Sequence, residues 1–189
     1  MRPTRLLLIL PLLFIAFIGM ITGTGCANIV PPAGGPRDSI EPLLLKVSPV
    51  DSSRNFNQRR INFTFDEFVE AQNTTQELLV SPVPKQMPAV DYKLNTITVK
   101  LKDSLEPNTT YTINFGNSIK DINEGNVLKN FTYVFSTGDH IDSLQFSGRV
   151  IMAETGKPDS TLLVMLHSNQ DASAVFKERP RYVARLDGK

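Results

Sequence analysis

Apolar residues that recur at every second position constrain the fold of this chain more than any other feature. The spacing of three and four that an amphipathic helix would show is hard to find in the same stretch. Seven runs alternate in this way: residues 43–47, 61–65, 78–80, 90–94, 97–101, 111–115 and 131–135. Because successive side chains of a strand point to opposite faces, each run predicts a strand with one buried face.

Short strands separated by turn residues predict an all-β fold, here an antiparallel β-sandwich in which two sheets cover one core. Residues 90–94 and 97–101 are linked across Asn95 and Thr96, which is short enough for a β-hairpin. The chain has no Trp and only one Cys, so this core has to be stable without disulfides. Most aromatic residues fall on the inward phase of the runs, which predicts core packing rather than a glycan-stacking surface.

One local motif supports the sandwich. Residues 105–111 have the spacing Leu-x-Pro-x-Thr-x-Tyr, in which Leu105, Pro107 and Tyr111 occupy the defining positions. This spacing is typical of a tyrosine corner, where the proline turns the chain between sheets and the tyrosine hydroxyl bonds to backbone upstream. We therefore expect Tyr111 to be buried with its hydroxyl satisfied.

Residues 40–138 resemble the bacterial Ig-like domain of the SbsA type. The resemblance rests on the tyrosine corner, a closing Phe-Ser-Thr-Gly, an Asp-Glu pair after an early strand and an Asp-x-x-x-Gly-Asn loop. These last two elements are Asp66-Glu67 and Asp121, Gly125 and Asn126. The resemblance implies a non-catalytic extracytoplasmic module with no defined ligand.

The N-terminal segment resembles a bacterial lipoprotein signal. Arg2 and Arg5 precede an apolar run over residues 6–21, and small residues then lead into Cys26. The run contains Pro11 and is shorter than the roughly 20 apolar residues that a membrane-spanning helix needs. A lipobox usually has Leu where this chain has Gly23. The resemblance implies a signal peptide at residues 1–25 that begins as a helix, with lipidation of Cys26.

Residues 26–39 are rich in proline and glycine and predict a flexible tether. The opening Cys-Ala-Asn and the following Pro-Pro-Ala-Gly-Gly-Pro-Arg-Asp are similar to envelope lipoproteins of Bacteroidota that carry this domain. No acidic run of the kind associated with surface export comes after Cys26. We therefore expect the outer membrane, with its periplasmic face favoured over the cell surface.

The charge balance excludes nucleic acid as a partner. Without residues 1–25 the chain has 18 basic and 19 acidic residues, and its longest basic run is Arg59-Arg60. The partners expected are the membrane, through lipidated Cys26, and an envelope protein or a glycan. The pattern Asp-Ser-apolar resembles an O-glycosylation acceptor of exported Bacteroidota proteins and occurs at Ser39, Ser104 and Ser143.

A second group of alternating runs begins at Asp142. Residues 144–150, 162–166 and 182–186 alternate, with a turn at 154–158. This arrangement resembles the start of a carboxypeptidase regulatory-like, prealbumin-like sandwich over residues 142–189. Three strands cannot close two sheets over one core, so we expect an incomplete second β-sandwich domain.

No catalytic, metal-binding or cofactor-binding residue is expected. His140 and His167 lie on different predicted domains, no second cysteine accompanies them, and no serine stands in a Gly-x-Ser-x-Gly elbow. The loop at 121–126 offers oxygen donors that suit calcium but lacks the closing glutamate of a calcium loop, so an Asx-type turn is favoured. Asp66 and Glu67 come after a strand, so their side chains are expected to point to opposite faces.

These features predict a non-catalytic, lipid-anchored cell-envelope protein whose Ig-like domain acts as a binding or spacer module. The alternative is the anchoring part of a larger envelope enzyme or glycan-capture protein whose active domain lies beyond Lys189. The two hypotheses agree on the sandwich and differ in whether an active domain comes after the second β region.

Overall fold

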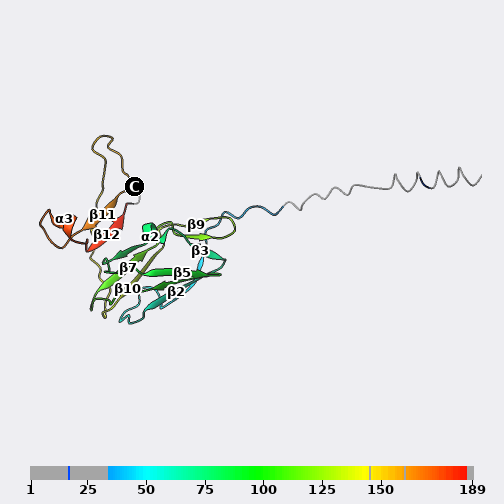
Figure 1. Cartoon of the computed structure of the whole chain (residues 1–189), viewed down its shortest axis with the longest axis horizontal. Helices are drawn as coiled ribbons and strands as arrows, with labels where there is room; N and C mark the ends of the chain where they lie inside the picture. Colours follow the sequence, from blue (N-terminus) through cyan, green and yellow to red (C-terminus); the bar gives the residue numbers. More distant parts are fainter. Residues whose placement is uncertain (1–16, 18–33, 145, 160, 187–189) are drawn as a thin grey trace, which may run out of the picture. The chain divides into compact units, whose positions relative to one another are not determined.

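Alternating strands bury one face each only if they pair into sheets, and a computed structural model of the chain shows which of them pair. The structure describes residues 17, 34–144, 146–159 and 161–186. The chain divides into two units, Met1–Arg37 and Asp38–Lys189. Cys26 and most of the expected signal peptide and tether lie outside the described residues, and the second unit contains all the strands (Figure 1).

The seven predicted strands form two antiparallel sheets. In spatial order the larger sheet contains β1 (Leu44–Ser48), β2 (Arg60–Phe65), β6 (Thr96–Lys100) and β5 (Ala89–Lys93). The smaller sheet contains β10 (Thr132–Ser136), β7 (Thr110–Asn114) and β4 (Leu79–Ser81). Each strand corresponds to one alternating run, so the prediction of an all-β sandwich is confirmed. We call residues 38–138 the sandwich.

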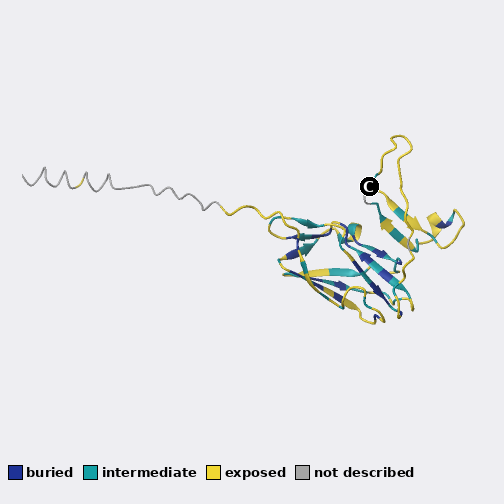
Figure 2. Cartoon of the chain, turned by 180° about the vertical axis from the view of Figure 1, so that it is seen from behind, coloured by how far each residue is buried: buried dark blue, intermediate teal, exposed yellow. Residues whose placement is uncertain are grey.

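The two sheets pack through the inward phase of the alternating runs. Phe63 of β2 is fully buried and meets Tyr133 of β10 edge to face, with ring centroids 5.3 Å apart. The sandwich core has 15 buried residues: Phe56, Ile61, Phe63, Phe65, Val69, Leu78, Val80, Ile97, Val99, Tyr111, Ile113, Phe115, Ile119, Tyr133 and Phe135. Figure 2 shows these buried positions along the strands of the sandwich. Burial of each large side chain contributes about 1.5–3 kcal/mol by removing apolar surface from water.

The first strand departs from the predicted phase. Leu43 and Leu45 are more than 60% exposed, whereas Leu44 and Val47 pack against the core. The register between β1 and β2 shifts between Leu44 and Lys46. Such a bulge adds one residue to the strand, so the inward side chains no longer keep strict alternation. The expectation that Leu43, Leu45 and Val47 share a buried face is therefore wrong for the two leucines.

The hairpin between β5 and β6 is confirmed, with its turn one residue earlier than predicted. Lys93 pairs with Thr96, so the turn residues are Leu94 and Asn95. Leu94 has a φ of 55°, a left-handed backbone that favours an exposed tight turn. Its side chain is 61% exposed, although it belongs to the apolar run. The turn geometry therefore overrides the alternation at this position.

The sandwich also contains a third, smaller sheet that was not predicted. It contains β3 (Val69–Ala71), β8 (Ile119–Asp121) and β9 (Val127–Leu128), in that order, and the short helix α2 (Thr74–Glu77) comes after β3. These strands have two or three residues, which is too short for a period to be recognised. The pairing of β3 with β8 brings two distant acidic segments together.

The last region of the chain forms one antiparallel hairpin. It contains β11 (Leu163–Leu166), α3 (Ala174–Lys177) and β12 (Tyr182–Arg185). The strands expected over 162–166 and 182–186 are therefore confirmed. The strand expected over 144–150 is wrong for the described residues, because none of them pairs with a neighbouring strand. Leu144 and Phe146 are 96% and 88% exposed.

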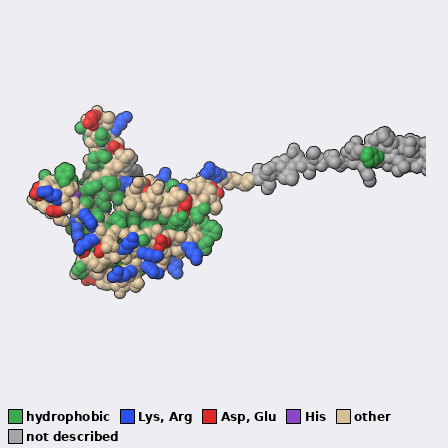
Figure 3. Space-filling view, in the orientation of Figure 1, with side chains coloured by type: hydrophobic (Ala, Val, Ile, Leu, Met, Phe, Trp, Pro, Cys, Tyr) green, Lys and Arg blue, Asp and Glu red, His purple; other side chains and the backbone are tan. Residues whose placement is uncertain are grey.

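This region has little interior of its own. Among the described residues of 142–186, Ala174 is the one buried apolar residue. Most of the region is exposed in Figure 2, and Figure 3 shows hydrophobic side chains gathered on the surface over β11 and β12. The alternating pattern is the same as in the sandwich, but no second sheet covers it within the part of the chain that the structure describes.

Candidate functional site

The loop after β8 is built around one buried carboxylate. Asp121 is 1% exposed and accepts hydrogen bonds from three backbone N–H groups in the loop that comes after it. The Gly125 N–H donates to Oδ1 at 3.0 Å, and the Asn126 N–H donates to Oδ2 at 2.6 Å. Gly125 has a φ of 81°, which a residue with a Cβ would adopt only with strain. The side chain of Asp121 thus bonds to the backbone of its own loop, as the expected Asx-type turn would, but the donors lie three to five residues on rather than two.

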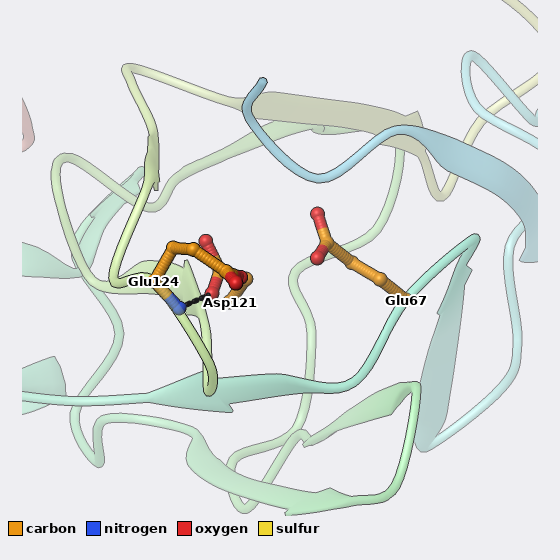
Figure 4. Close-up of side chains that lie close together, drawn as sticks. All are labelled: Glu67, Asp121 and Glu124. Atoms are coloured by element: carbon orange, nitrogen blue, oxygen red, sulfur yellow. Dashed lines mark hydrogen bonds between the residues drawn. The ribbon is translucent and has the colours of Figure 1, made fainter. Parts of the chain in front are cut away.

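Glu67 comes to this loop from the other side. It lies between β2 and β3, and the pairing of Val69 with Asp121 places it opposite the loop. Carboxylate oxygens of Glu67, Asp121 and Glu124 lie within 4.8 Å of one another (Figure 4). We call these three residues the acidic cluster. Figure 4 shows Glu67 reaching toward the two loop residues across a short gap.

Asp66 and Glu67 point to different partners, as expected for adjacent residues after a strand. Asp66 accepts a hydrogen bond from the Leu43 N–H at 2.8 Å, whereas Glu67 joins the acidic cluster. The meeting of Glu67 with Asp121 is not predicted by either sequence segment alone. The Asp-Glu pair and the Asp-x-x-x-Gly-Asn loop belong to one family pattern, but that pattern does not indicate that the two segments meet. The unpredicted pairing of β3 with β8 is what joins them.

The pKa values of Glu67 and Asp121 shift in opposite directions. Burial raises the pKa of Glu67, and the charges of Asp121, Asp66, Asp38 and Glu124 raise it further. Burial also acts to raise the pKa of Asp121, but its backbone N–H donors together outweigh burial and hold that pKa below its ordinary value. Asp121 therefore stays ionised and holds the loop. The negative charges around Glu67 favour its protonated form.

The acidic cluster has the donor type that a hard cation such as calcium prefers, which is carboxylate oxygen. Both oxygens of Asp121 already accept backbone N–H bonds, so the role that the geometry supports directly is to hold the loop. Among the described residues this is the one group of three carboxylate, histidine or cysteine ligands that lie close enough to share an ion. Neither histidine belongs to it.

The two histidines lie in unrelated surroundings. His140 is exposed and contacts Asp139 at 2.8 Å and Asp142 at 3.5 Å. The hydrogen bond with Asp139 is the main cause of its raised pKa. His167 is partly buried, and its Nδ1 has no partner among the described residues. Within the described part of the chain, neither histidine forms a hydrogen bond with a serine.

The tyrosine corner is formed as predicted. Tyr111 is 4% exposed, and its hydroxyl oxygen accepts a hydrogen bond from the Glu106 N–H at 2.9 Å. Burial is the main cause of the raised pKa of Tyr111. The Thr137 hydroxyl donates to the Glu106 carbonyl at 2.7 Å and accepts from the Thr109 N–H at 2.9 Å. The corner therefore joins the start of β7 to the residues that come after β10.

The residues expected to be modified differ in what the structure says of them. Ser39, Ser104 and Ser143 are all exposed, so each hydroxyl is at the surface. Cys26 lies outside the described residues. Among the residues that are described, no helix is long and apolar enough to cross a membrane.

The sandwich, its corner and its acidic loop lie within a stretch that matches a known protein family. The family model described as Bacterial Ig-like domain matches residues 38–137, which is more than half of the chain. The chain belongs to the bacterial Ig-like domain family. We therefore call residues 38–137 the Ig-like domain. Its matched range contains every strand of the two sandwich sheets, from β1 to β10.

A solved structure is similar to this chain but indicates no function for it. The chain is similar to the protein in the "Crystal structure of the S-layer protein rSbsC(31-844)", at 20% sequence identity and a TM-score of 0.34. That match covers 78% of this chain and 18% of the S-layer chain, so it spans a small part of the larger protein. No curated protein matches the chain.

Proposed function

We propose that the chain is a lipid-anchored protein of the bacterial cell envelope, in which the Ig-like domain is a non-catalytic binding or spacer module. The observation that carries the proposal is the order of features along the chain. A basic and apolar leader ends in small residues and Cys26, a proline-rich stretch comes next, and the Ig-like domain begins at residue 38. This order suits a folded module held at a distance from a membrane.

Acylation supplies the anchor in this proposal. A single acyl chain gives only marginal membrane binding, whereas two or more give stable attachment. Cys26 is the only cysteine, so its sulfur and, after cleavage, its new amine are the groups that would carry the chains. We place the protein in the outer membrane, with the periplasmic face favoured because no acidic run comes after Cys26.

A binding or spacer role suits the Ig-like domain because its buried polar side chains, Asp121 and Tyr111, stabilise its own loops. Asp121 holds the loop at 121–126, and Tyr111 holds the corner at 105–111. The partner that we propose is an envelope protein or a glycan. Ser39, Ser104 and Ser143 are proposed O-glycosylation sites, since each is exposed within an Asp-Ser-apolar triplet.

The anchor is tested by replacing its nucleophile. Cys26→Ser should abolish incorporation of labelled palmitate, leave an unprocessed precursor and release the protein from stable lipid attachment. Ser39→Ala is a matched control that lies near the anchor but is not an acyl acceptor, and it should label like the parent. Equal labelling of Cys26→Ser and the parent would refute the lipoprotein proposal. Intact-mass comparison of Ser39→Ala, Ser104→Ala and Ser143→Ala with the parent tests the glycosylation sites.

A further inference from the structure

The open edge of the smaller sheet is covered by a strand from the last region of the chain. Among the described strands, β4 pairs with β7 on one side only, so its other side is a sheet edge. An uncovered edge exposes backbone groups that other strands can pair with. β12 lies beside this edge: the Val83 N–H donates to the Arg181 carbonyl at 3.0 Å. The Ser81 hydroxyl accepts from the Val183 N–H at 3.0 Å and donates to the Val183 carbonyl at 2.8 Å.

The face that β12 presents to β4 is not the apolar one. Arg181, Val183 and Arg185 are partly buried, whereas Tyr182 and Ala184 are exposed. The run at 182–186 was expected to bury Tyr182, Ala184 and Leu186, and that phase is wrong for the first two. Two arginines that are partly buried favour acidic partners on the opposite surface, because removing an unpaired charge from water is costly.

The first acidic partner is Glu106 of the tyrosine corner. Arg181 donates to both of its carboxylate oxygens, at 2.7 and 2.6 Å, which is the bidentate geometry that arginine favours. The hydrogen bonds from Arg181 are the main cause of the lowered pKa of Glu106. The backbone N–H of Glu106 is bonded to the hydroxyl of buried Tyr111, so the acceptor is held in place.

The second acidic partner is Glu77, at the end of α2. Its Oε2 lies 3.2 Å from Nη2 of Arg185 and accepts a hydrogen bond from the Asn117 N–H at 3.0 Å. A Cβ at Gly116 would overlap this Oε2, so only glycine leaves room for the carboxylate. Arg181 and Arg185 are four residues apart, which is about 13 Å along a strand, and both point to the same side.

We propose that the edge of β4 is a docking strip for an extended strand with two arginines four residues apart, and that β12 together with the preceding Arg181 is its occupant. The strip consists of Glu77, Ser81, Val83 and Glu106. Its charges complement those of β12, and its one serine satisfies both backbone groups of Val183. Because the described part of 142–186 has almost no core, docking is what orders the hairpin β11–β12. The hairpin therefore moves as one body with the Ig-like domain.

Amide hydrogen exchange of the full chain tests this. The Val83 and Val183 amides should be protected in the parent. Glu106→Arg should speed exchange at Val183 by at least tenfold while the Ile113 amide, inside β7, keeps its protection. Combining Glu106→Arg with Arg181→Glu should restore protection at Val183. Asp91→Arg makes the same charge change at the exposed pair with Lys100 and should leave Val183 unchanged.

Three results would overturn the proposal. One is unprotected Val83 and Val183 amides in the parent. Another is unchanged exchange at Val183 in Glu106→Arg. The third is failure of the double variant to restore protection although Ile113 stays protected. If Glu106→Arg also exposes Ile113, Arg181→Glu alone decides the question, because its side chain lies outside the sandwich and should release only the hairpin.

Discussion

The sandwich and the region over residues 142–186 have the same alternating sequence pattern and use it differently. In the sandwich, ten of the 15 buried core residues lie on strands of the two facing sheets, and Val69 and Ile119 come from the third sheet. In the later region the described residues include one buried apolar side chain, Ala174, and many exposed ones. Alternation thus marks a strand with two unlike faces, but burial depends on whether another sheet covers the apolar face.

The difference also shows in what holds each region. The sandwich is held by packing between aromatic and branched side chains, such as Phe63 against Phe115 and Tyr133. The hairpin β11–β12 is held by hydrogen bonds and ion pairs to the edge of β4. Partly exposed ion pairs contribute little energy each, so the hairpin should open far more readily than the sandwich unfolds.

The largest effect is expected from removing a core ring. Phe63→Ala deletes the ring that three others meet edge to face, and should destabilise the fold by about 3–5 kcal/mol through lost burial and a cavity. Phe146→Ala is the matched change in the other region, at a ring that is 88% exposed. It should change the free energy of unfolding by less than about 0.5 kcal/mol. Urea unfolding measures both changes in the free energy of unfolding. Equal losses of stability in the two variants would contradict the difference between the regions.

A smaller effect is expected at the tyrosine corner. Tyr111→Phe keeps the ring but leaves the Glu106 N–H without its acceptor, so stability should fall by roughly 1–3 kcal/mol. Tyr92→Phe removes a hydroxyl from a ring that is 48% exposed and should be near neutral. An unchanged urea midpoint for Tyr111→Phe would mean that its hydroxyl bond adds nothing to the fold.

Glycines in the two regions should also respond differently. Gly116 has a φ of 56°, and an added Cβ would overlap Oε2 of Glu77 and lie 2.9 Å from its carbonyl oxygen. Gly116→Ala should cost roughly 1–2 kcal/mol from the left-handed backbone alone and should also loosen the contact with Arg185. An added Cβ at Gly148 meets nothing within 4 Å, so Gly148→Ala should be neutral. Thermal unfolding of the two variants gives the comparison, and a tolerated Gly116→Ala would contradict the packing around Glu77.

The smallest effect is a dependence on pH at the acidic cluster. The pKa of Glu67 is raised above its ordinary 4.5, so the folded state holds this proton more tightly than the unfolded state. The resulting destabilisation is absent below pH 4.5 and grows as the pH rises through the folded-state pKa. Glu67→Gln should therefore be more stable than the parent at pH 7, and the difference should vanish below about pH 4. Glu154→Gln, at an exposed turn, is the control. A difference between Glu67→Gln and the parent that persists unchanged at low pH would rule out this cause.

The sandwich could be predicted from sequence because its signals are local. Alternation marks its seven strands, and the spacing from Leu105 to Tyr111 marks the corner. The features that could not be predicted depend on pairing between distant segments. The bulge in β1, the meeting of Glu67 with Asp121 and the inward phase of β12 each result from a partner strand that no local pattern identifies. Arg181 and Arg185 show this best, because their ion pairs are with glutamates 75 and 108 residues away in the sequence.

The central claim is that the sandwich folds by itself whereas the later region is ordered only by docking. Amide proton dispersion of two separate segments, residues 38–140 and residues 142–189, tests it most directly. Residues 38–140 should give a well-dispersed spectrum and a cooperative melt, because they contain the entire core cluster. Residues 142–189 alone should give a collapsed spectrum or aggregate through uncovered strand edges. A well-dispersed spectrum with a cooperative melt from residues 142–189 alone would contradict the account.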